Sequence, residues 1–128
     1  MLGSMLIAAA LMASQSMTAA SDPAWVRVGG DASGEFSAHP ASIQRRGDRV
    51  RALIRLSFGQ ATETGLRQGV MQYEIDCRAS TVRTERYDTY TDRGFNSTEV
   101  PPADQIRHVP IAPNSPNSVV RDYLCTRR

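Results

Sequence analysis

The sequence predicts an α+β domain in which an antiparallel sheet of about five or six strands carries a C-terminal helix on one face, held there by a disulfide. Three observations support this fold class. Residues 71–77 and residues 50–58 each alternate apolar and polar side chains, which is typical of strands with one buried face. The apolar period becomes helical after Ser115. The two cysteines, Cys77 and Cys125, fall at the end of the first segment and in the last.

The segment 71–77 shows the clearest alternation in the chain. Its apolar face consists of Met71, Tyr73, Ile75 and Cys77, and its polar face consists of Gln72, Glu74 and Asp76. Such a pattern predicts a strand that buries one face and exposes the other to water. The buried face therefore ends in a thiol.

The segment 50–58 is predicted to be the antiparallel neighbour of this strand, because a polar loop bracketed by Gly59 and Gly69 connects the two. Two registers keep like faces together. One sets Arg51 opposite Asp76 and the other sets Arg55 opposite Glu74. Each solvated pair contributes a few tenths to about 1 kcal/mol. These four side chains are the candidate partner-binding residues, and surface ion pairing is the simpler explanation for them.

The remaining elements are predicted from turn residues and alternation. Further strands are expected at residues 25–28 (closed by a turn at Gly29-Gly30), 34–39, 81–90, 95–100 and, along an edge, 106–111. The segment 81–90 alternates poorly, so exposure on both faces is expected. Arg46-Gly47-Asp48 has the letters of an integrin-binding tripeptide, but Gly-Asp is ordinary hairpin chemistry and a turn explains it.

The last segment is predicted to be a helix capped by Ser115, with Pro116 in its first turn. Its apolar stripe consists of Val119, Val120, Tyr123 and Leu124. Cys125 lies about 170° from the centre of that stripe on an ideal helix. Either the last turn unwinds or the helix makes the bridge from its flank, and we expect the last turn to unwind because terminal turns fray.

Residues 1–20 are predicted to be a signal peptide and residues 21–128 a single domain. The apolar run 5–12 is too short to span a bilayer and is followed by small residues before Ser21. A buried N-terminal helix is the alternative. Export places both cysteines in an oxidising compartment, which favours a Cys77–Cys125 disulfide, and it leaves no membrane span in the mature chain.

The composition excludes some classes of function. Fifteen basic and thirteen acidic residues are interleaved and the net charge is +2, which argues against nucleic-acid binding. The two cysteines and the distant His39 and His108 lack metal-site spacing, so no metal or cofactor is expected. No nucleophile with a base, no catalytic carboxylate pair and no cofactor loop stands out, so no catalytic residue is assigned.

Several short motifs occur in a characteristic order: Trp25, the arginine-flanked strand at Val50, residues 73–78 (YEIDCR), residues 112–115 (APNS) and residues 123–125 (YLC). In this order they resemble the surface-adhesin protein E-like family of Gram-negative envelope proteins, over residues 25–125. The resemblance implies an antiparallel sheet with a C-terminal helix pinned by a disulfide. For the namesake members it also implies binding of host matrix proteins.

The expected function is that of a non-catalytic exported envelope protein, an adhesin-like module in the periplasm or at the cell surface of a Gram-negative bacterium. Its partner is expected to be a protein, either a host matrix protein or an envelope component, and a homodimer is a further possibility. The alternative is a small periplasmic enzyme or enzyme inhibitor with its site in a loop such as residues 59–69. A cleft containing His108 would favour that alternative.

Overall fold

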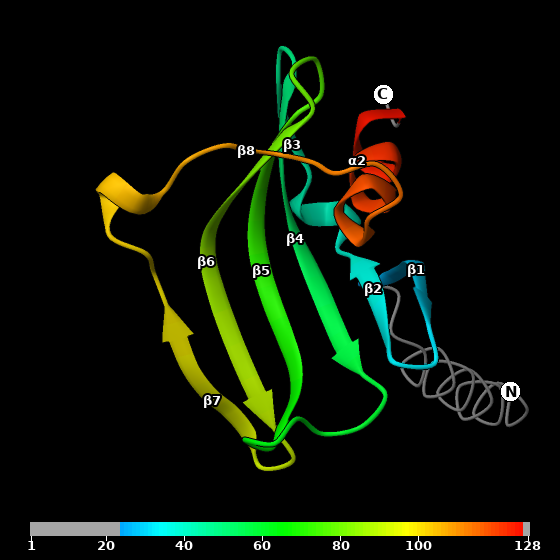
Figure 1. Cartoon of the computed structure of the whole chain (residues 1–128), viewed down its shortest axis with the longest axis vertical. Helices are drawn as coiled ribbons and strands as arrows, with labels where there is room; N and C mark the ends of the chain where they lie inside the picture. The colour runs from blue at the N-terminus through cyan, green and yellow to red at the C-terminus, as the bar shows by residue number, and fades with distance from the viewer. Residues whose placement is uncertain (1–23, 127–128) are drawn as a thin grey trace, which may run out of the picture.

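A computed structural model describes residues 24–126 (Figure 1). The signal peptide expected at residues 1–20 lies outside the described residues. The strands are β1 (Val26–Asp31), β2 (Gly34–Ala38), β3 (Gln44–Arg46), β4 (Arg49–Phe58), β5 (Leu66–Asp76), β6 (Thr81–Thr91), β7 (Gly94–Glu99) and β8 (Val109–Pro110). They are joined by two 3-10 turns, η1 (Pro40–Ser42) and η2 (Ala103–Gln105), and followed by the helix α2 (Pro116–Thr126).

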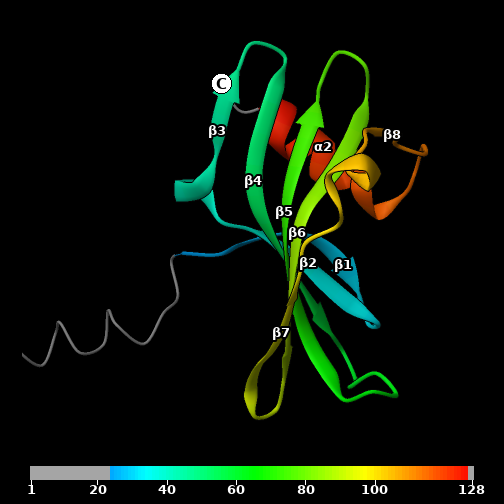
Figure 2. The ribbon, with the colours of Figure 1, turned by 90° about the vertical axis from the view of Figure 1, so that its left-hand side faces the viewer.

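The described strands form one antiparallel sheet with the order β1-β2-β4-β5-β6-β7, while β3 pairs with β4 and β8 pairs with β6. The predicted fold class is confirmed, because the six strands of the main path are supplemented only by the three-residue β3 and the two-residue β8. In Figure 2 α2 lies behind β4–β6. We call the face that packs against α2 the inner face and the opposite one the outer face.

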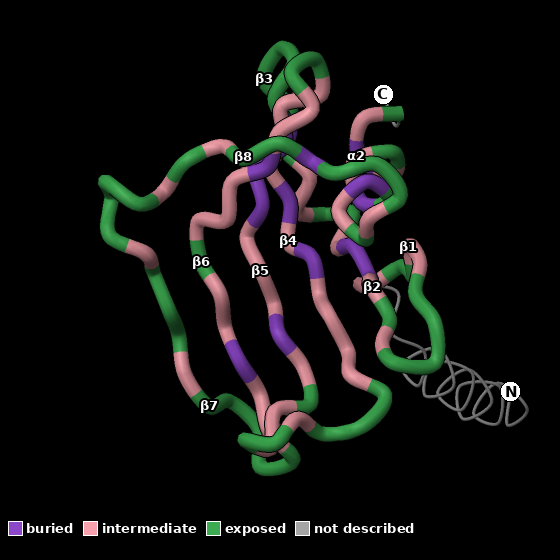
Figure 3. The backbone as a smooth tube through the Cα atoms, in the orientation of Figure 1, coloured by how far each residue is buried: buried purple, intermediate pink, exposed green. Residues whose placement is uncertain are grey.

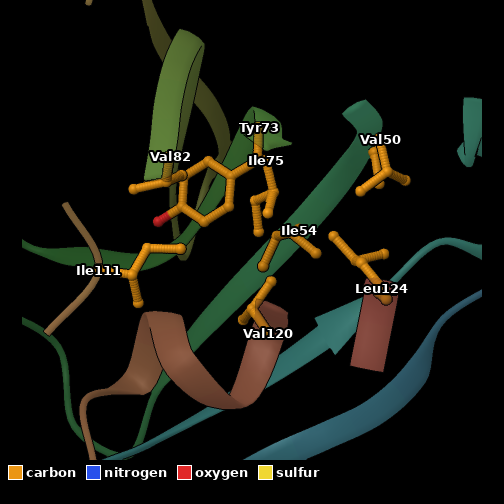
Figure 4. Packing of buried hydrophobic residues seen from close by; sticks show 10 residues of the cluster. Val50, Ile54, Tyr73, Ile75, Val82, Ile111, Val120 and Leu124 are labelled. Carbon is orange, nitrogen blue, oxygen red and sulfur yellow. The ribbon is translucent and has the colours of Figure 1, made fainter. Parts of the chain in front are cut away.

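The hydrophobic core lies between the inner face and α2 (Figure 4). It consists of Ala38, Val50, Ala52, Ile54, Tyr73, Ile75, Val82, Ile111, Val120 and Leu124. Most buried positions of β4–β6 therefore lie in the half of the sheet next to α2 (Figure 3). The Tyr73 hydroxyl donates a hydrogen bond to Asn117 Oδ1 at 3.1 Å, and burial raises the pKa of this phenol above its usual range.

The faces of β4 and β5 were predicted correctly, but both predicted registers are wrong. The structure pairs Arg51 with Glu74 and Arg49 with Asp76, a shift of two residues from the nearer prediction. This register sets Ile54 opposite Met71 and Val50 opposite Ile75, so apolar side chains face each other across the inner face. The loop is also shorter than expected, because β5 begins at Leu66 and only residues 59–65 remain outside the strands.

A β-bulge explains the poor alternation of residues 81–90. Gln72 pairs with Arg86 while Tyr73 pairs with Thr84, which leaves Glu85 as an extra residue in β6. An extra residue moves every later side chain to the opposite face. The expectation of a strand exposed on both faces is therefore wrong: Val82 and Thr89 are both buried, on either side of the bulge.

The helix begins as predicted, because the backbone N–H of Ser118 donates to Ser115 Oγ at 3.2 Å. It does not unwind, since α2 continues through Thr126. The Cys77–Cys125 disulfide forms from the flank of the helix, with the two Cα atoms 5.7 Å apart. Cys77 lies just beyond the last residue of β5, so the bridge requires no strand residue to reach sideways across the sheet.

Two further expectations need correction at the edges of the sheet. The strand β1 passes through Gly29-Gly30 to Asp31 instead of turning there. Gly30 has φ +142°, a conformation that side chains rarely adopt, and a Cβ on Gly29 would lie 3.0 Å from Val119 Cγ1, so glycine lets β1 approach α2. The edge segment 106–111 contributes only the two residues of β8.

Candidate functional site

The outer face carries a cluster of charges centred on the Glu74 carboxylate. Oε1 lies 3.0 Å from His108 Nε2, 3.2 Å from Arg83 Nη2 and 3.4 Å from Arg49 Nη1, and Oε2 lies 3.4 Å from Arg51 Nη2. The Glu74 side chain is only 11% exposed. The expectation of a solvated ion pair is therefore wrong for Glu74, because groups from β4, β6 and the segment before β8 cover it.

A second carboxylate, that of Glu85, completes this cluster. Its Oε1 lies 2.7 Å from Arg51 Nε, and its Oε2 accepts hydrogen bonds from both Arg51 Nη2 and Arg83 Nη2 at 2.9 Å. Glu85 lies two residues after Arg83 and so shares its face, and the bulge places the next residue, Arg86, on that face as well. Arg51 and Arg83 each contact both glutamates and are held in place by them.

Asp76 stabilises the turn that follows β5. Its Oδ1 accepts hydrogen bonds from the backbone N–H groups of Arg78 at 3.0 Å and Ala79 at 2.9 Å. These bonds, the one from Ala79 first, hold the pKa of Asp76 below its usual value, with smaller contributions from the charges of Arg49 and His108. Asp76 is therefore a turn-stabilising residue more than a free surface charge.

Replacing Asp76 with asparagine is expected to make the stability of the fold depend less steeply on pH under acidic conditions. A carboxyl whose pKa is lowered by folding stabilises the native state fully above its unfolded pKa, near 3.8, and loses that contribution as pH falls through the lower folded value. Melting temperatures measured from pH 2 to pH 6 should fall less steeply for Asp76→Asn than for the unmodified chain. Parallel curves would contradict this role of Asp76.

His108, directly before the edge strand β8, links two strands of the sheet. Its Nδ1 lies 3.0 Å from Thr81 Oγ1 and its Nε2 lies 3.0 Å from Glu74 Oε1. The order hydroxyl, imidazole, carboxylate is that of a catalytic triad. Here, however, arginines already contact the carboxylate, and His108 lines none of the hollows described below. We therefore interpret this chain of hydrogen bonds as structural.

Arg55 is separated from the other three predicted residues. Its guanidinium carbon lies 4.7 Å from the centre of the Trp25 ring, a cation–π contact. Trp25 in turn meets His39 edge to face, with ring centres 5.1 Å apart. The structure thus brings Arg51, Glu74 and Asp76 together with Arg49 on the outer face, while Arg55 supports a tryptophan farther along the sheet.

Three adjoining hollows form a groove along the outer face. The first, of about 120 Å³, is lined by Gln44, Arg46, Arg49, Arg51 and Glu74. The second, of about 410 Å³, shares Gln44 and Arg51 with it and continues over Leu53 and Gln72. The third, of about 290 Å³, shares Leu53 and Gln72 and adds Trp25, Val70, Arg86, Asp88 and Tyr90. We call this continuous surface the outer-face groove. It begins among arginines and ends between aromatic rings.

A further hollow, of about 450 Å³, lies at the start of α2. It is lined mainly by small and apolar residues of β1, β2 and β4, including Phe36, Leu56 and Phe58, together with Val119 of the helix. Within residues 24–126 no cluster of three or more histidine, cysteine or acidic side chains could hold a metal ion, and no helix is long and apolar enough to cross a membrane.

The described residues form a small module whose distinctive surface is one face of a disulfide-held sheet. The chain belongs to the surface-adhesin protein E family, whose model matches residues 25–126. It is accordingly an adhesin-like surface protein, and none of the proteins that it matches favours the enzyme alternative. No curated protein matches the chain in sequence.

Solved structures of Haemophilus influenzae protein E share the fold. Crystal form II superimposes with a TM-score of 0.63 at 11% identity, covering 83% of this chain and 90% of that one. A second structure of the same protein gives a TM-score of 0.61 at 11% identity, covering 83% and 86%. The protein E of non-typeable Haemophilus influenzae gives 0.60 at 11%, covering 83% and 78%.

Proposed function

We propose that this chain is exported and binds a protein partner, a host matrix protein or a component of the cell envelope, through the outer-face groove. The observation that carries the proposal is the continuity of the three hollows along the face opposite α2. Binding sites on proteins combine apolar and aromatic area with a few placed polar groups. In the groove, Leu53 and Trp25 provide the apolar and aromatic area, and the arginines provide the polar groups.

The four predicted partner-binding residues take different parts in this proposal. Arg51 lines the groove directly. Glu74 lines its first hollow and holds the neighbouring arginines in position. Arg55 supports the Trp25 ring at the other end, and Asp76 shapes the turn after β5. Arg51 is therefore the member of the set expected to contact the partner, and the others act through their neighbours.

Location and assembly belong to the same proposal. A membership among surface adhesins supports export to the surface of a Gram-negative bacterium, after removal of residues 1–20. The alternative to the cell surface is the periplasm, where the partner would be a component of the cell envelope. A homodimer stays a prediction. Arg46-Gly47-Asp48 forms the tip of the β3–β4 hairpin, where Gly47 has φ +58°, and any further role of this tripeptide also stays a prediction.

Replacing Leu53 with glutamate is expected to reduce partner binding by about tenfold or more, because it places a charge in the middle of the groove where apolar contact is needed. Binding is measured to a panel of immobilised matrix proteins and, separately, to an envelope extract. Val100→Glu is the matched control, since Val100 is 63% exposed and lines none of the three hollows. Equal loss of binding in both variants, or loss in neither, would contradict the proposal.

A further inference from the structure

Two arginines stand directly opposite each other at the arginine end of the groove. Arg46 of β3 pairs with Arg49 of β4 on either side of the hairpin loop. Like charges directly opposite on one face of a sheet destabilise it. Within residues 24–126, the Arg46 side chain makes no ion pair or hydrogen bond that could compensate. Arg46 is therefore a positive charge that no carboxylate of the described residues offsets.

The existing contacts of Arg49 leave it able to take another partner. Its Nη1 lies 3.4 Å from Glu74 and its Nε lies 3.8 Å from Asp76, and its side chain is 54% exposed. Good charge-assisted hydrogen bonds between arginine and a carboxylate measure about 2.7–2.9 Å. Arg51 differs, because its Nη2 donates a hydrogen bond to Glu85 Oε2 at 2.9 Å. The Arg49 side chain is thus held by long contacts only, whereas the Arg51 side chain is held in one position by Glu85.

The hollow between these groups matches a single anionic group in size and charge. Its volume of about 120 Å³ is well below the roughly 300–1,000 Å³ of pockets that enclose drug-sized ligands. Three arginines and one carboxylate line it, and Gln44 adds an amide donor. Asp76 and Glu85 contact Arg49 and Arg51 from outside the hollow, so among the described residues Arg46 is the lining arginine without a carboxylate partner. Arg83 also contacts Glu74 from beyond the hollow, so several arginines share this carboxylate.

We propose that Gln44, Arg46 and Arg49 bind a carboxylate, supplied by an aspartate or glutamate side chain of the protein partner. The arginine forks suit the planar carboxylate, which accepts two parallel hydrogen bonds from one guanidinium. The carboxylate site itself stands on the hollow alone, whereas its assignment to a protein partner rests on the proposed function.

The rest of the groove favours an acidic protein segment over a sulfated polysaccharide. A polysaccharide with repeated sulfates needs a row of basic sites along its length. Beyond Arg51 the groove continues over Leu53 and Gln72, and at its far end Arg86 is paired with Asp88 at 3.0 Å. One anchoring acid followed by apolar side chains fits this surface.

The test uses the whole mature chain and N-acetyl-glutamate amide as the probe. Arginine Nε–H signals are followed by NMR as the probe is added at constant ionic strength, with N-acetyl-glutamine amide as the neutral control. The signals of Arg46 and Arg49 should shift saturably with the acid and stay unchanged with the amide. Arg46→Gln should weaken binding about tenfold or more, because it removes a charged donor.

Arg93→Gln is the matched control, since Arg93 lies in the exposed turn between β6 and β7 and lines none of the three hollows. Equal shifts with acid and amide, or equal weakening in Arg46→Gln and Arg93→Gln, would overturn the site. A sulfated disaccharide that binds more than ten times as tightly as the glutamate derivative would overturn the carboxylate assignment. Leu53→Glu should leave probe binding intact, so failure of this site and failure of the groove give different results.

Discussion

Replacing both Cys77 and Cys125 with serine is expected to lower the free energy of unfolding by about 4 kcal/mol. The bridge closes a loop with a sequence separation of 48, and the chain-entropy model assigns that stabilisation to a loop of this length. Small domains have a total stability of about 5–15 kcal/mol. The loss would therefore leave a marginally stable chain, with α2 held to the inner face by side-chain contacts alone.

Urea unfolding with and without a reducing agent measures this effect. The reductant should destabilise the unmodified chain by about the same amount as the double substitution, and it should not change the unfolding of the serine variant. A reductant effect on the serine variant would mean that another process is being observed. Equal stability of the oxidised chain and the variant would show that the disulfide contributes nothing to the native state.

Replacing Glu74 with alanine is expected to lower the free energy of unfolding by about 2–3 kcal/mol. Removing one member of a buried charge pair leaves its partners uncompensated, which typically costs about 3–5 kcal/mol. The cost is smaller here because Arg49 and Arg51 are 54% and 41% exposed and can turn towards water. Arg83 and His108 are less exposed and would bear most of the effect.

Glu35→Ala is the matched control for this substitution. Glu35 pairs with Arg27 at 3.2 Å, and both side chains are more than half exposed, so the cost should be at most about 1 kcal/mol. Chemical unfolding of both variants at the same pH and salt concentration measures the difference. Similar losses in the two variants would contradict the central position of Glu74 in the cluster.

The alternation of polar and apolar residues was enough to predict the faces of β4 and β5, because successive side chains of an extended strand point to opposite faces whichever strand lies beside it. It could not determine their register. Any shift by two residues keeps the same faces together, and the choice among such shifts depends on how Ile54, Met71, Val50 and Ile75 pack. Packing of this kind is a tertiary property. The pattern therefore could not decide which residue of β5 lies opposite Arg51 or Arg55.

The candidate site was predicted in part. Arg51, Glu74 and Asp76 do lie together, but their neighbours Arg83 and His108 come from distant segments, and no local signal placed them there. Glu85 had a signal, since the alternation of residues 81–90 fails at that position, yet a bulge and a poorly packed strand give the same irregular pattern. The end of α2 was mispredicted because Cys77 lies beyond β5, where it meets the flank of the helix without any unwinding.

The extra residue in β6 also limits how this chain can be compared with distant relatives. At 11% identity, an alignment of β6 depends almost entirely on matching inward and outward positions. If a relative lacks the bulge, an ungapped alignment of this strand will compare groove residues such as Asp88 with core residues of the other protein. A one-residue gap at Glu85 restores the correspondence. Without it, conserved binding positions after the bulge would be mistaken for substitutions in the core.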